Sequence, residues 1–383
     1  MATPSVWPVP TEPELYIGLM SGTSLDGVDG VLVEFSPPDP SQAVTQRVLA
    51  HAAHAFPTAL GAELLALNSA GNDELHRSAT AAQALATVYA EVVAELLHSS
   101  ALPDAAVRAI GAHGQTVRHR PDCGYSLQIN APAWLAERTG ISVVADFRSR
   151  DVAAGGQGAP LVPAFHRAVF ARAGRDVAVL NLGGFANLSL LFADGRTLGF
   201  DTGPGNVLLD AWAQQHLRKA FDAGGEWAAR GAVHPALLRA LLGEGYFSRQ
   251  PPKSTGRDAF HPAWLQRHLA ALEQPLPPVD VQATLSALTA GSVADALLQA
   301  MPQVAELVVC GGGARNTDLL NRLREALPGV PCTPSDAHGL PAEQVEAVAF
   351  AWLAQQVLHG LPGNLPAVTG AAGPRVLGAI YPA

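Results

Sequence analysis

One pattern of strands and turns occurs twice along this chain, and it limits the folds that the chain can adopt. In each half a strand runs into a glycine-rich turn, two further strands follow, and helical sequence comes next. The expected strands are 15–20, 28–35, 46–56, 107–112 and 141–147 in the first half, and 177–182, 187–192, 197–201 and 306–310 in the second. The repeat predicts a duplicated α/β architecture, with a cleft between the halves that can hold a ligand.

Length and composition are those of a globular protein with about two domains. The chain has 383 residues, of which 48 % are apolar, and its formal charge of −9 argues against nucleic acid or an anionic membrane surface as the main partner. Its three cysteines are widely spaced and fit neither a disulfide framework nor a zinc site. No basic leader with an apolar run opens the sequence, and no uncharged apolar segment approaches the ~20 residues that span a bilayer. We therefore expect a cytoplasmic protein that binds neither nucleic acid nor membrane.

The turn of the first copy, GLMSGTSLDGVD at 18–29, has the composition of a phosphate-binding loop. Its glycines permit positive φ and close approach, so backbone N–H groups and hydroxyls can surround an anion. Asp26 and Asp29 stand beside it and could hold a divalent cation through water. The same residue types are common in ordinary surface hairpins, so that interpretation stays open.

The second copy contains a comparable stretch, FDTGPGN at 200–206, at the end of a strand and the start of a helix. Gly203 and Gly205 allow a tight turn, and the helix from Asn206 onward is expected to offer unpaired N–H groups to a phosphate. Asp201 would stand at the mouth of this turn, although it could instead be a capping or turn aspartate. One such loop in each half favours phosphate chemistry.

A third glycine-rich loop, CGGGARN at 310–316, also follows an expected strand. Glycines at 311–313 allow a flat group, such as a nucleotide base, to lie against the backbone. Asn316 stands where a dinucleotide-binding G-x-G-x-x-G would need glycine, so that motif is absent. Walker-type, HExxH and GxSxG motifs are absent too, which leaves zinc-peptidase and common hydrolase functions without support.

Together these stretches resemble the anhydro-N-acetylmuramic acid kinase family, bacterial sugar kinases of the acetate kinase, hexokinase, Hsp70 and actin superfamily. The resemblance covers nearly the whole chain and rests on GLMSGTSLDGVD, GAHGQT at 111–116, VADFR at 144–148, DVAAGGQGAPL at 151–161, NLGG at 181–184, FDTGPGN, PKSTGR at 252–257, VCGGGARN, Thr369-Gly370 and GPR at 373–375. It implies an α/β fold of duplicated RNase H-like (actin-like ATPase) domains around an interdomain cleft. Domain I would comprise residues 1–150 and 365–383, and domain II residues 151–364.

The resemblance also implies an activity. An enzyme of this family opens 1,6-anhydro-N-acetylmuramic acid with water and phosphorylates O6 from ATP, giving N-acetylmuramic acid 6-phosphate and ADP in cell-wall recycling. The implied general base is the aspartate of FDTGPGN, Asp201, because one base near both reacting atoms can serve the coupled step. The implied cofactors are ATP and Mg²⁺, with Asp26 holding the metal through water. A levoglucosan-type anhydrosugar kinase is the alternative, and a homodimer is one expectation for an oligomeric state that the sequence leaves open.

Two further groups of residues follow from the resemblance. The expected ATP-binding residues are Gly22, Thr23, Ser24, Leu25, Asp26, Gly27, Val28, Asp29, Gly203, Gly205, Gly311, Gly312 and Gly313. The expected sugar-binding residues, which follow or end central strands, are His113, Gln115, Thr116, Asp146 and Arg148. An arginine can grip a carboxylate such as that of the lactyl group through two parallel hydrogen bonds. His113 could instead be a buried core histidine, and Asp146 with Arg148 a structural ion pair.

Three other classes share some of these features. An ATP-dependent chaperone of the same superfamily would need a peptide-binding module for which the chain has no room, and a ROK-type regulator or kinase would usually carry a Cys-rich zinc motif. A nicotinamide-dependent oxidoreductase has only the loop at 311–316 in its favour. The basic, Pro-rich loop at 248–258 could close over a substrate or be an ordinary exposed loop.

Overall fold

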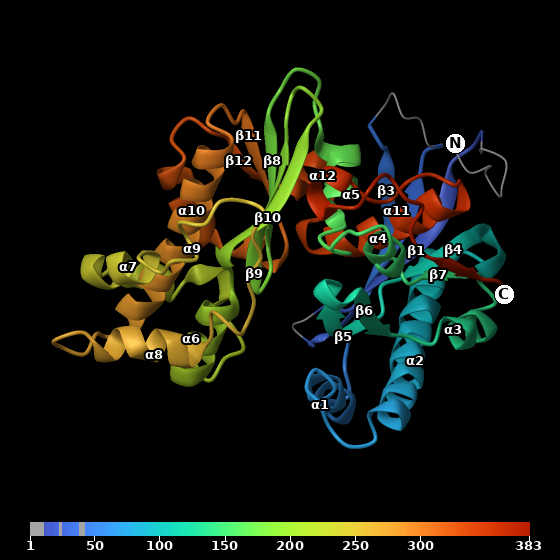
Figure 1. Cartoon of the computed structure of the whole chain (residues 1–383), viewed down its shortest axis with the longest axis horizontal. Helices are drawn as coiled ribbons and strands as arrows, with labels where there is room; N and C mark the ends of the chain where they lie inside the picture. The colour runs from blue at the N-terminus through green and yellow to red at the C-terminus, as the bar shows by residue number, and fades with distance from the viewer. Residues whose placement is uncertain (1–10, 23–24, 38–42) are drawn as a thin grey trace. The chain divides into compact units, whose positions relative to one another are not determined.

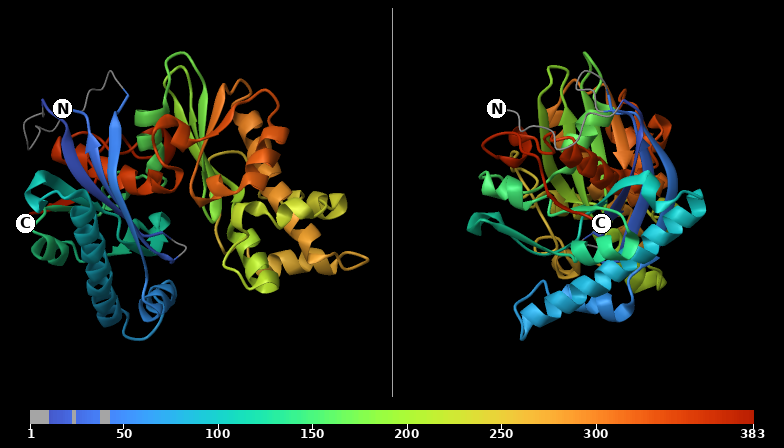
Figure 2. Two further views of the ribbon diagram at one scale, coloured as in Figure 1. Left: turned by 180° about the vertical axis from the view of Figure 1, so that it is seen from behind. Right: turned by 90° about the vertical axis from the view of Figure 1, so that its right-hand side faces the viewer.

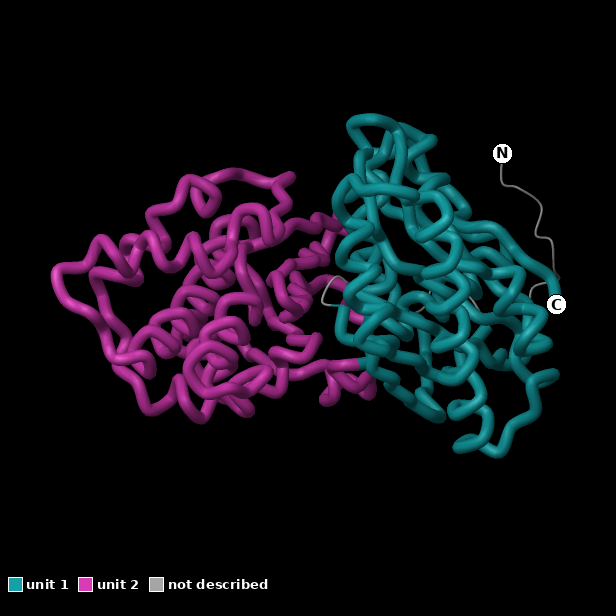
Figure 3. The backbone as a smooth tube through the Cα atoms, turned by 90° about the horizontal axis from the view of Figure 1, so that it is seen from below, with its two compact units in different colours: residues 1–169, 344–383 teal, residues 170–343 magenta. Residues whose placement is uncertain are grey.

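The chain folds into two compact units (Figure 3). The computed structural model describes residues 11–22, 25–37 and 43–383. Unit 1 combines residues 1–169 with the C-terminal segment 344–383, and unit 2 is the continuous segment 170–343.

Unit 1 is built on a six-stranded mixed sheet in the order β13-β7-β4-β1-β2-β3 (Figure 1). Its strands are β1 (Glu14–Met20), β2 (Gly27–Phe35), β3 (Gln46–Ala55), β4 (Val107–Ala112), β7 (Val143–Ala145) and β13 (Ala379–Tyr381). Strands β1, β2 and β3 pair antiparallel, whereas β1 with β4 and β4 with β7 pair parallel. A separate two-stranded sheet joins β5 (Gln115–Arg120) to β6 (Tyr125–Ile129).

Helices cover both faces of this sheet (Figure 2). The helices of unit 1 are α1 (Thr58–Ala66), α2 (Glu74–Ser100), α3 (Pro132–Thr139), α4 (Ser149–Ala153), α5 (Val162–Phe170), α11 (Val345–Leu358) and α12 (Pro366–Thr369). Of these, α2 packs on β2 and β3, and α11 packs on β1, β2 and β4. Successive side chains of a strand point to opposite faces. Ile17 and Leu19 of β1 therefore pack into the apolar core with α2, while Gly18 between them faces α11. A Cβ on Gly18 would lie 1.9 Å from the carbonyl oxygen of Ala347, so only glycine lets α11 approach the sheet this closely.

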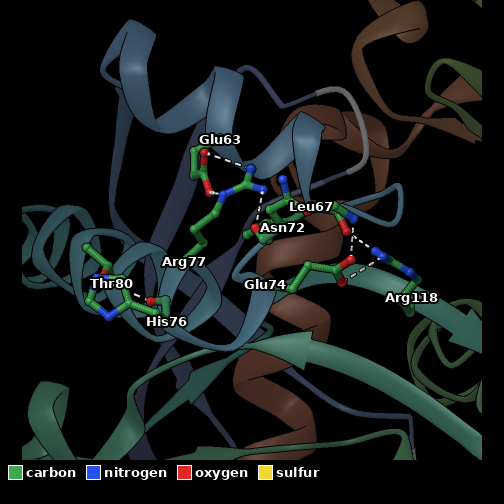
Figure 4. A network of polar contacts seen from close by, with 9 residues as sticks. Glu63, Leu67, Asn72, Glu74, His76, Arg77, Thr80 and Arg118 are labelled. Carbon is green, nitrogen blue, oxygen red and sulfur yellow. Dashed lines mark hydrogen bonds and ion pairs between the residues drawn. The ribbon is translucent and has the colours of Figure 1, made fainter.

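A polar network connects α1, α2 and β5 (Figure 4). Arg77 of α2 donates from Nε to Glu63 Oε1 of α1 at 2.6 Å, and Arg118 Nη2 of β5 donates to Glu74 Oε2 at 2.9 Å. Arg118 also donates to the carbonyl oxygen of Leu67. The network fixes β5, the strand that begins at Gln115, against the first turn of α2.

Unit 2 is built on a five-stranded sheet in the order β10-β9-β8-β11-β12. Its strands are β8 (Val177–Leu182), β9 (Phe185–Leu191), β10 (Thr197–Pro204), β11 (Glu306–Cys310) and β12 (Cys332–Pro334), and its helices are α6 (Val207–Leu217), α7 (Pro235–Leu242), α8 (Pro262–Ala270), α9 (Pro278–Ala300) and α10 (Thr317–Ala326). The apolar cluster of this sheet includes side chains of α9 and α10.

Two helices, α2 and α9, are long and apolar enough to cross a membrane by length and composition alone. In α9, 72 % of the most apolar window is buried inside the protein, and in α2 half of it is. Both helices contribute to the apolar cores of their units, which accounts for their composition.

The two sheets share one topology. Taken in chain order, their strands lie in the order 3-2-1-4-5, as β3-β2-β1-β4-β7 in unit 1 and as β10-β9-β8-β11-β12 in unit 2. The first three strands of each are antiparallel and the last two parallel to the first. This is the RNase H-like arrangement, so the predicted duplication of an α/β domain is confirmed. The predicted cleft stays a prediction.

The boundaries of the units differ from the predicted boundaries at 150 and 364. Residues 151–169 and 344–364 belong to unit 1. One reason is that α11 packs on β1 and β4. A second reason is Asp151 of α4, whose buried carboxylate accepts hydrogen bonds from Asn364 Nδ2 at 2.6 Å and Thr369 Oγ1 at 2.8 Å. These contacts between distant parts of the sequence were not predicted from local pattern.

Candidate functional site

Asp201 lies near the end of β10, where the backbone and one neighbouring loop hold it. Its Oδ2 accepts a hydrogen bond from the backbone N–H of Thr255 at 3.0 Å, and its own N–H donates to the carbonyl oxygen of Lys253 at 3.1 Å. The hydroxyl of Tyr246 donates to its carbonyl oxygen at 2.7 Å. Among the described residues, none forms a hydrogen bond with Oδ1, so one carboxylate oxygen is left for a ligand.

Burial raises the pKa of Asp201, and the hydrogen bond from Thr255 offsets only part of that rise. A buried carboxylate without a cation beside it is a stronger base than an exposed one. Its surroundings therefore move Asp201 toward the pKa range that a general base uses.

The loop that carries PKSTGR lies against Asp201 through Lys253 and Thr255. Next to it, a pocket of about 440 Å³ opens between the turn after α7 and the start of α8, and Tyr246, Arg249, Thr255 and Arg267 are among its lining residues. The Thr255 hydroxyl is buried without a hydrogen-bond partner. Unit 2 thus has a polar pocket that shares two residues with the surroundings of Asp201.

The glycine turns of unit 2 are held mainly by the backbone. Gly205 N–H donates to the carbonyl oxygen of Gly184 at 3.0 Å, and Asn206 N–H donates to that of Gly183 at 2.9 Å. Val207 N–H also bonds to Gly184. The expectation of unpaired N–H groups from Asn206 onward was therefore wrong for Asn206 and Val207. Both N–H groups donate to carbonyl oxygens of the β8–β9 hairpin.

Close packing explains most of the predicted glycines in unit 2. A Cβ on Gly205 would lie 2.4 Å from Gly183 O, one on Gly203 2.7 Å from a ring carbon of Phe247, and one on Gly311 2.4 Å from Asn181 Oδ1. Gly312 differs, since it is exposed and a Cβ there would meet nothing within 4 Å. Gly312 is therefore the member of this loop that leaves open space beside the backbone.

In unit 1, the predicted phosphate loop is the connection between β1 and β2. Thr23 and Ser24 lie outside the described residues. On either side of them, Leu25 N–H donates a hydrogen bond to Gly22 O at 3.3 Å. Leu25 has a positive φ of 61°. Asp26 is exposed, and its carbonyl oxygen accepts from Phe56 N–H at 3.0 Å. The carboxylate of Asp26 is thus presented to solvent at the end of the loop.

The last three residues of the predicted loop belong to strand β2. Gly27 faces β3 so closely that a Cβ would lie 2.1 Å from the carbonyl oxygen of His54. Val28 is a core side chain at 1 % exposure, and Asp29 Oδ1 lies 3.4 Å from His51 Nε2. The described part of the loop proper therefore ends at Asp26.

His113 follows β4 and is almost completely buried. Its Nε2 lies 2.9 Å from both Arg148 Nη2 and Gln128 Nε2, and its Nδ1 lies 3.0 Å from the carbonyl oxygen of Ser21. A guanidinium can only donate, so Nε2 is the acceptor and the proton is on Nδ1, where it is donated to Ser21. Burial and then the charge of Arg148 lower the pKa of His113 to about 3, so the ring is neutral at physiological pH.

Arg148 is held at both ends of its fork. Nη1 donates to the carbonyl oxygen of Gly158 at 2.8 Å and Nη2 to His113, while Nε is buried without a partner. Burial lowers the pKa of Arg148 to about 10, although Glu346 and Asp151 act in the opposite direction. A buried guanidinium with an unused donor is suited to an anionic or carbonyl oxygen of a ligand.

The remaining predicted sugar-binding residues have different surroundings. Gln115 Nε2 donates to the carbonyl oxygen of Gly22 at 3.1 Å, and its Oε1 is buried without a partner. Thr116 Oγ1 accepts from Gln128 at 3.0 Å. Asp146 is exposed with a positive φ of 59°, and its carboxylate accepts from the hydroxyl of Ser149 at 2.6 Å. The structure thus brings His113, Gln115, Thr116 and Arg148 into one polar cluster and leaves Asp146 at its edge.

Some residues of these sites were not predicted. Tyr89 and Gln128 belong to the polar cluster of unit 1. In the sequence, Tyr89 occupies one of the regularly spaced apolar positions of α2, which predicts an ordinary core residue. Gly183 and Gly184 connect β8 to β9, at the position that the β1–β2 loop has in unit 1. The duplication was the signal that could have assigned them a role.

Two RNase H-like units, each with a glycine-containing hairpin after its first strand, define the class of the actin-like ATPases and their related sugar kinases. The family model described as anhydro-N-acetylmuramic acid kinase matches residues 14–383, so the chain belongs to this family.

Relatives of high identity carry the same description. An anhydro-N-acetylmuramic acid kinase of Variovorax paradoxus is 59 % identical over 97 % of this chain and 99 % of its own length. That of Ralstonia nicotianae is 57 % identical over 97 % and 98 %. That of Bordetella petrii is 59 % identical over 98 % of both chains. The alternative classes considered from sequence are therefore set aside.

Proposed function

We propose that Asp201 is the general base of the reaction for which the family is named. In that reaction, 1,6-anhydro-N-acetylmuramic acid is opened by water and phosphorylated on O6 by ATP, in the recycling of the cell wall. The observation that carries the assignment to Asp201 is its combination of one free carboxylate oxygen with a pKa raised by burial. Thr255 and Tyr246 hold the residue, so the free oxygen has a fixed direction.

The proposed step balances in bonds and protons. Asp201 takes a proton from a water molecule while the water oxygen forms a bond to the anomeric carbon. The bond from that carbon to O6 breaks, and O6 forms a bond to the γ-phosphorus, from which ADP departs. The products are N-acetylmuramic acid 6-phosphate and ADP. Because the phosphoryl transfer itself needs little covalent help, positioning of the phosphates supplies most of the remaining acceleration.

We assign the phosphates of ATP to the two first hairpins. Gly22 and Asp26 would act from the hairpin of unit 1, together with Thr23 and Ser24, which lie outside the described residues. From the equivalent hairpin of unit 2, we add Gly183 and Gly184 to the phosphate-binding residues. Gly203 and Gly205 would act from the turn that is hydrogen-bonded to this hairpin. The exposed Gly312, with Gly311 and Gly313 beside it, would lie under the adenosine.

Mg²⁺ is expected with ATP, and Asp26 is our candidate to hold it through water. Among the described residues, no group of three or more His, Cys, Asp or Glu side chains is arranged to hold a metal. A single exposed carboxylate nevertheless fits this ion, since Mg²⁺ keeps several waters and takes its other ligands from phosphate oxygens. The metal would neutralise charge that develops on the phosphates.

We assign the sugar to the polar cluster of His113, Gln115, Thr116 and Arg148, with Asp146 at its edge. Arg148 Nε and Gln115 Oε1 support this assignment, because both are buried polar atoms without partners and the substrate carries a carboxylate and an amide. His113 would act as a neutral ring that orients Arg148. A levoglucosan-type sugar, which lacks both the carboxylate and the amide, would leave these atoms unused.

The test of the base is Asp201→Asn, assayed by ADP release from Mg-ATP with 1,6-anhydro-N-acetylmuramic acid, N-acetylmuramic acid or levoglucosan. We expect activity on the anhydro-amino sugar and a loss of about 10²–10⁴-fold in kcat in the variant. Asp194→Asn, an exposed aspartate in the β9–β10 turn, is the matched control and is expected to be fully active. Full activity of Asp201→Asn would refute the assignment, and activity on levoglucosan alone would change the substrate.

A cytoplasmic location is inferred from the need for ATP, and it can be tested by fractionation of cells. The homodimer stays a prediction, for which the molecular mass in solution is the measurement.

A further inference from the structure

The hydroxyl of Tyr89 lies at the centre of the polar cluster in unit 1, although it belongs to none of the motifs. Tyr89 is on α2 and its side chain is completely buried. Its oxygen lies 2.9 Å from Ser21 Oγ and accepts a hydrogen bond from Gly114 N–H at 3.0 Å. Ser21 Oγ in turn donates to the carbonyl oxygen of Gly114 at 3.0 Å.

These three hydrogen bonds have one consistent direction. A backbone carbonyl can only accept and a backbone N–H can only donate, and each hydroxyl has one proton. Ser21 uses its proton for Gly114 O, so the bond between the two hydroxyls must use the proton of Tyr89. The result is a closed ring from Gly114 N–H through Tyr89 and Ser21 back to Gly114 O, in which every polar group is satisfied.

The ring joins two segments that follow neighbouring parallel strands. Ser21 follows β1 and Gly114 follows β4, and the register of these strands places Leu19 beside Ala112. Side chains of the second segment bind the first on either side of the ring. His113 Nδ1 donates to Ser21 O, and Gln115 Nε2 donates to Gly22 O.

We propose that Tyr89 is a positioning residue, whose hydroxyl sets the placement of Ser21 and Gly22, the last described residues before the predicted phosphate loop, relative to the sugar-binding segment 113–116. This inference rests on the function proposed above. Without the hydroxyl, the N–H of Gly114 and the Oγ of Ser21 would lose a partner in a place that water does not reach. The two segments would then shift to find new partners, and a shift of about 1 Å between reacting groups can lower a rate by about 10²-fold.

The test compares Tyr89→Phe with Tyr16→Phe. Tyr16 is a matched control, because it is also completely buried in unit 1 and its hydroxyl donates to Glu14 Oε2 at 2.8 Å, yet it takes no part in the ring. Both variants are assayed at saturating Mg-ATP and 1,6-anhydro-N-acetylmuramic acid, and their melting temperatures are measured. We expect kcat to fall about 10–100-fold in Tyr89→Phe and to change less than about twofold in Tyr16→Phe, with both proteins folded.

A double-mutant cycle with Ser21→Ala makes the ring itself testable. Because Tyr89 and Ser21 act in one ring, we expect the second substitution to lower kcat little further once the first is made. If the double variant lost kcat by the product of the two single losses, the ring would be refuted. An unchanged kcat in Tyr89→Phe, measured where Asp201→Asn is inactive, would refute it as well. Absence of sugar-dependent ADP release in the wild-type protein would instead refute the proposed function, so the two failures are distinguishable.

Discussion

The polar cluster of unit 1 and the surroundings of Asp201 in unit 2 use buried polar groups in different ways. In unit 1, Tyr89, Ser21 and His113 use their hydrogen-bonding groups on each other and on the backbone. In unit 2, the Asp201 carboxylate is held by the backbone N–H of Thr255 at one oxygen only. A closed set of hydrogen bonds can position other groups, whereas an open carboxylate can take a proton.

Burial favours the neutral form in both places. It lowers the pKa of His113 to about 3 and raises the pKa of Asp201. The neutral ring of His113 accepts a hydrogen bond from Arg148 Nη2, while the ionised carboxylate of Asp201 is a stronger base than an exposed one. The comparison teaches that a shifted pKa indicates a reactive group only where that group also has a polar atom without a hydrogen-bond partner.

The largest expected effect comes from opening the unit 1 cluster with Gly114→Ala. Gly114 has φ 75°, and a Cβ would lie 2.9 Å from the carbonyl oxygen of Ile129, so the segment must move away from Ile129 and its hydrogen bonds with Tyr89 and Ser21 are disturbed. We expect a loss of about 3 kcal/mol in the free energy of unfolding and a strong loss of kcat. Gly124→Ala is the control, since φ there is 81° but no atom lies within 4 Å, and it should cost about 1 kcal/mol with normal kcat. Equal urea midpoints and activities for the two variants would contradict this prediction.

The next effect is the pH dependence of stability that His113 imposes. The folded state holds His113 neutral down to about pH 3, whereas the unfolded chain protonates it below about 6.5. Its contribution is therefore constant above pH 6.5 and is lost as the pH falls from 6.5 toward 3, by about 1.4 kcal/mol per pH unit. Urea unfolding at several pH values should show a shallower slope for His113→Asn than for the wild-type protein. Parallel slopes would show that His113 is protonated in the folded state.

The smallest expected effect has the opposite sign and concerns Asp201. Because burial raises the pKa of this carboxyl in the folded state, ionisation opposes folding as the pH rises above the unfolded pKa, and the effect is complete above the folded pKa. Asp201→Asn removes the charge, and the amide oxygen can still accept from Thr255. We expect the inactive variant to be more stable by about 1 kcal/mol at neutral pH, with no gain in acid below the unfolded pKa. A lower melting temperature at neutral pH would mean that the ionised carboxylate stabilises the fold.

Much of the fold was predictable from local pattern. The strand periods and the glycine turns predicted the strands β1 to β4 and β8 to β11, and their repetition predicted the duplication. The unit boundaries were not predictable in the same way. They depend on α11 returning to β1 and β4 and on Asp151 binding Asn364, which are contacts over long separations in sequence.

The place of Asp201 near the end of a strand, beside a glycine turn, was predictable from the sequence, and its role as a base stays a prediction. The glycine loops were predictable as turns, but Gly205 and Gly311 are needed for close packing, which spacing alone cannot reveal. Tyr89 could not be identified, because one hydroxyl on an apolar helix face looks like ordinary core in sequence. Only the fold shows that this hydroxyl meets Ser21 and Gly114.

The return of α11 to unit 1 has a consequence for the order in which a ribosome delivers the chain. Unit 2 is continuous, so all its strands are synthesised before residue 344 is added. Five of the six strands of the unit 1 sheet are synthesised earlier but wait for α11, and until then Gly18 and Gly111 line an uncovered strip of β1 and β4. Such a face exposes apolar surface in the nascent chain, which is the kind of surface that chaperones bind. The N-terminal half is thus made first and completed last.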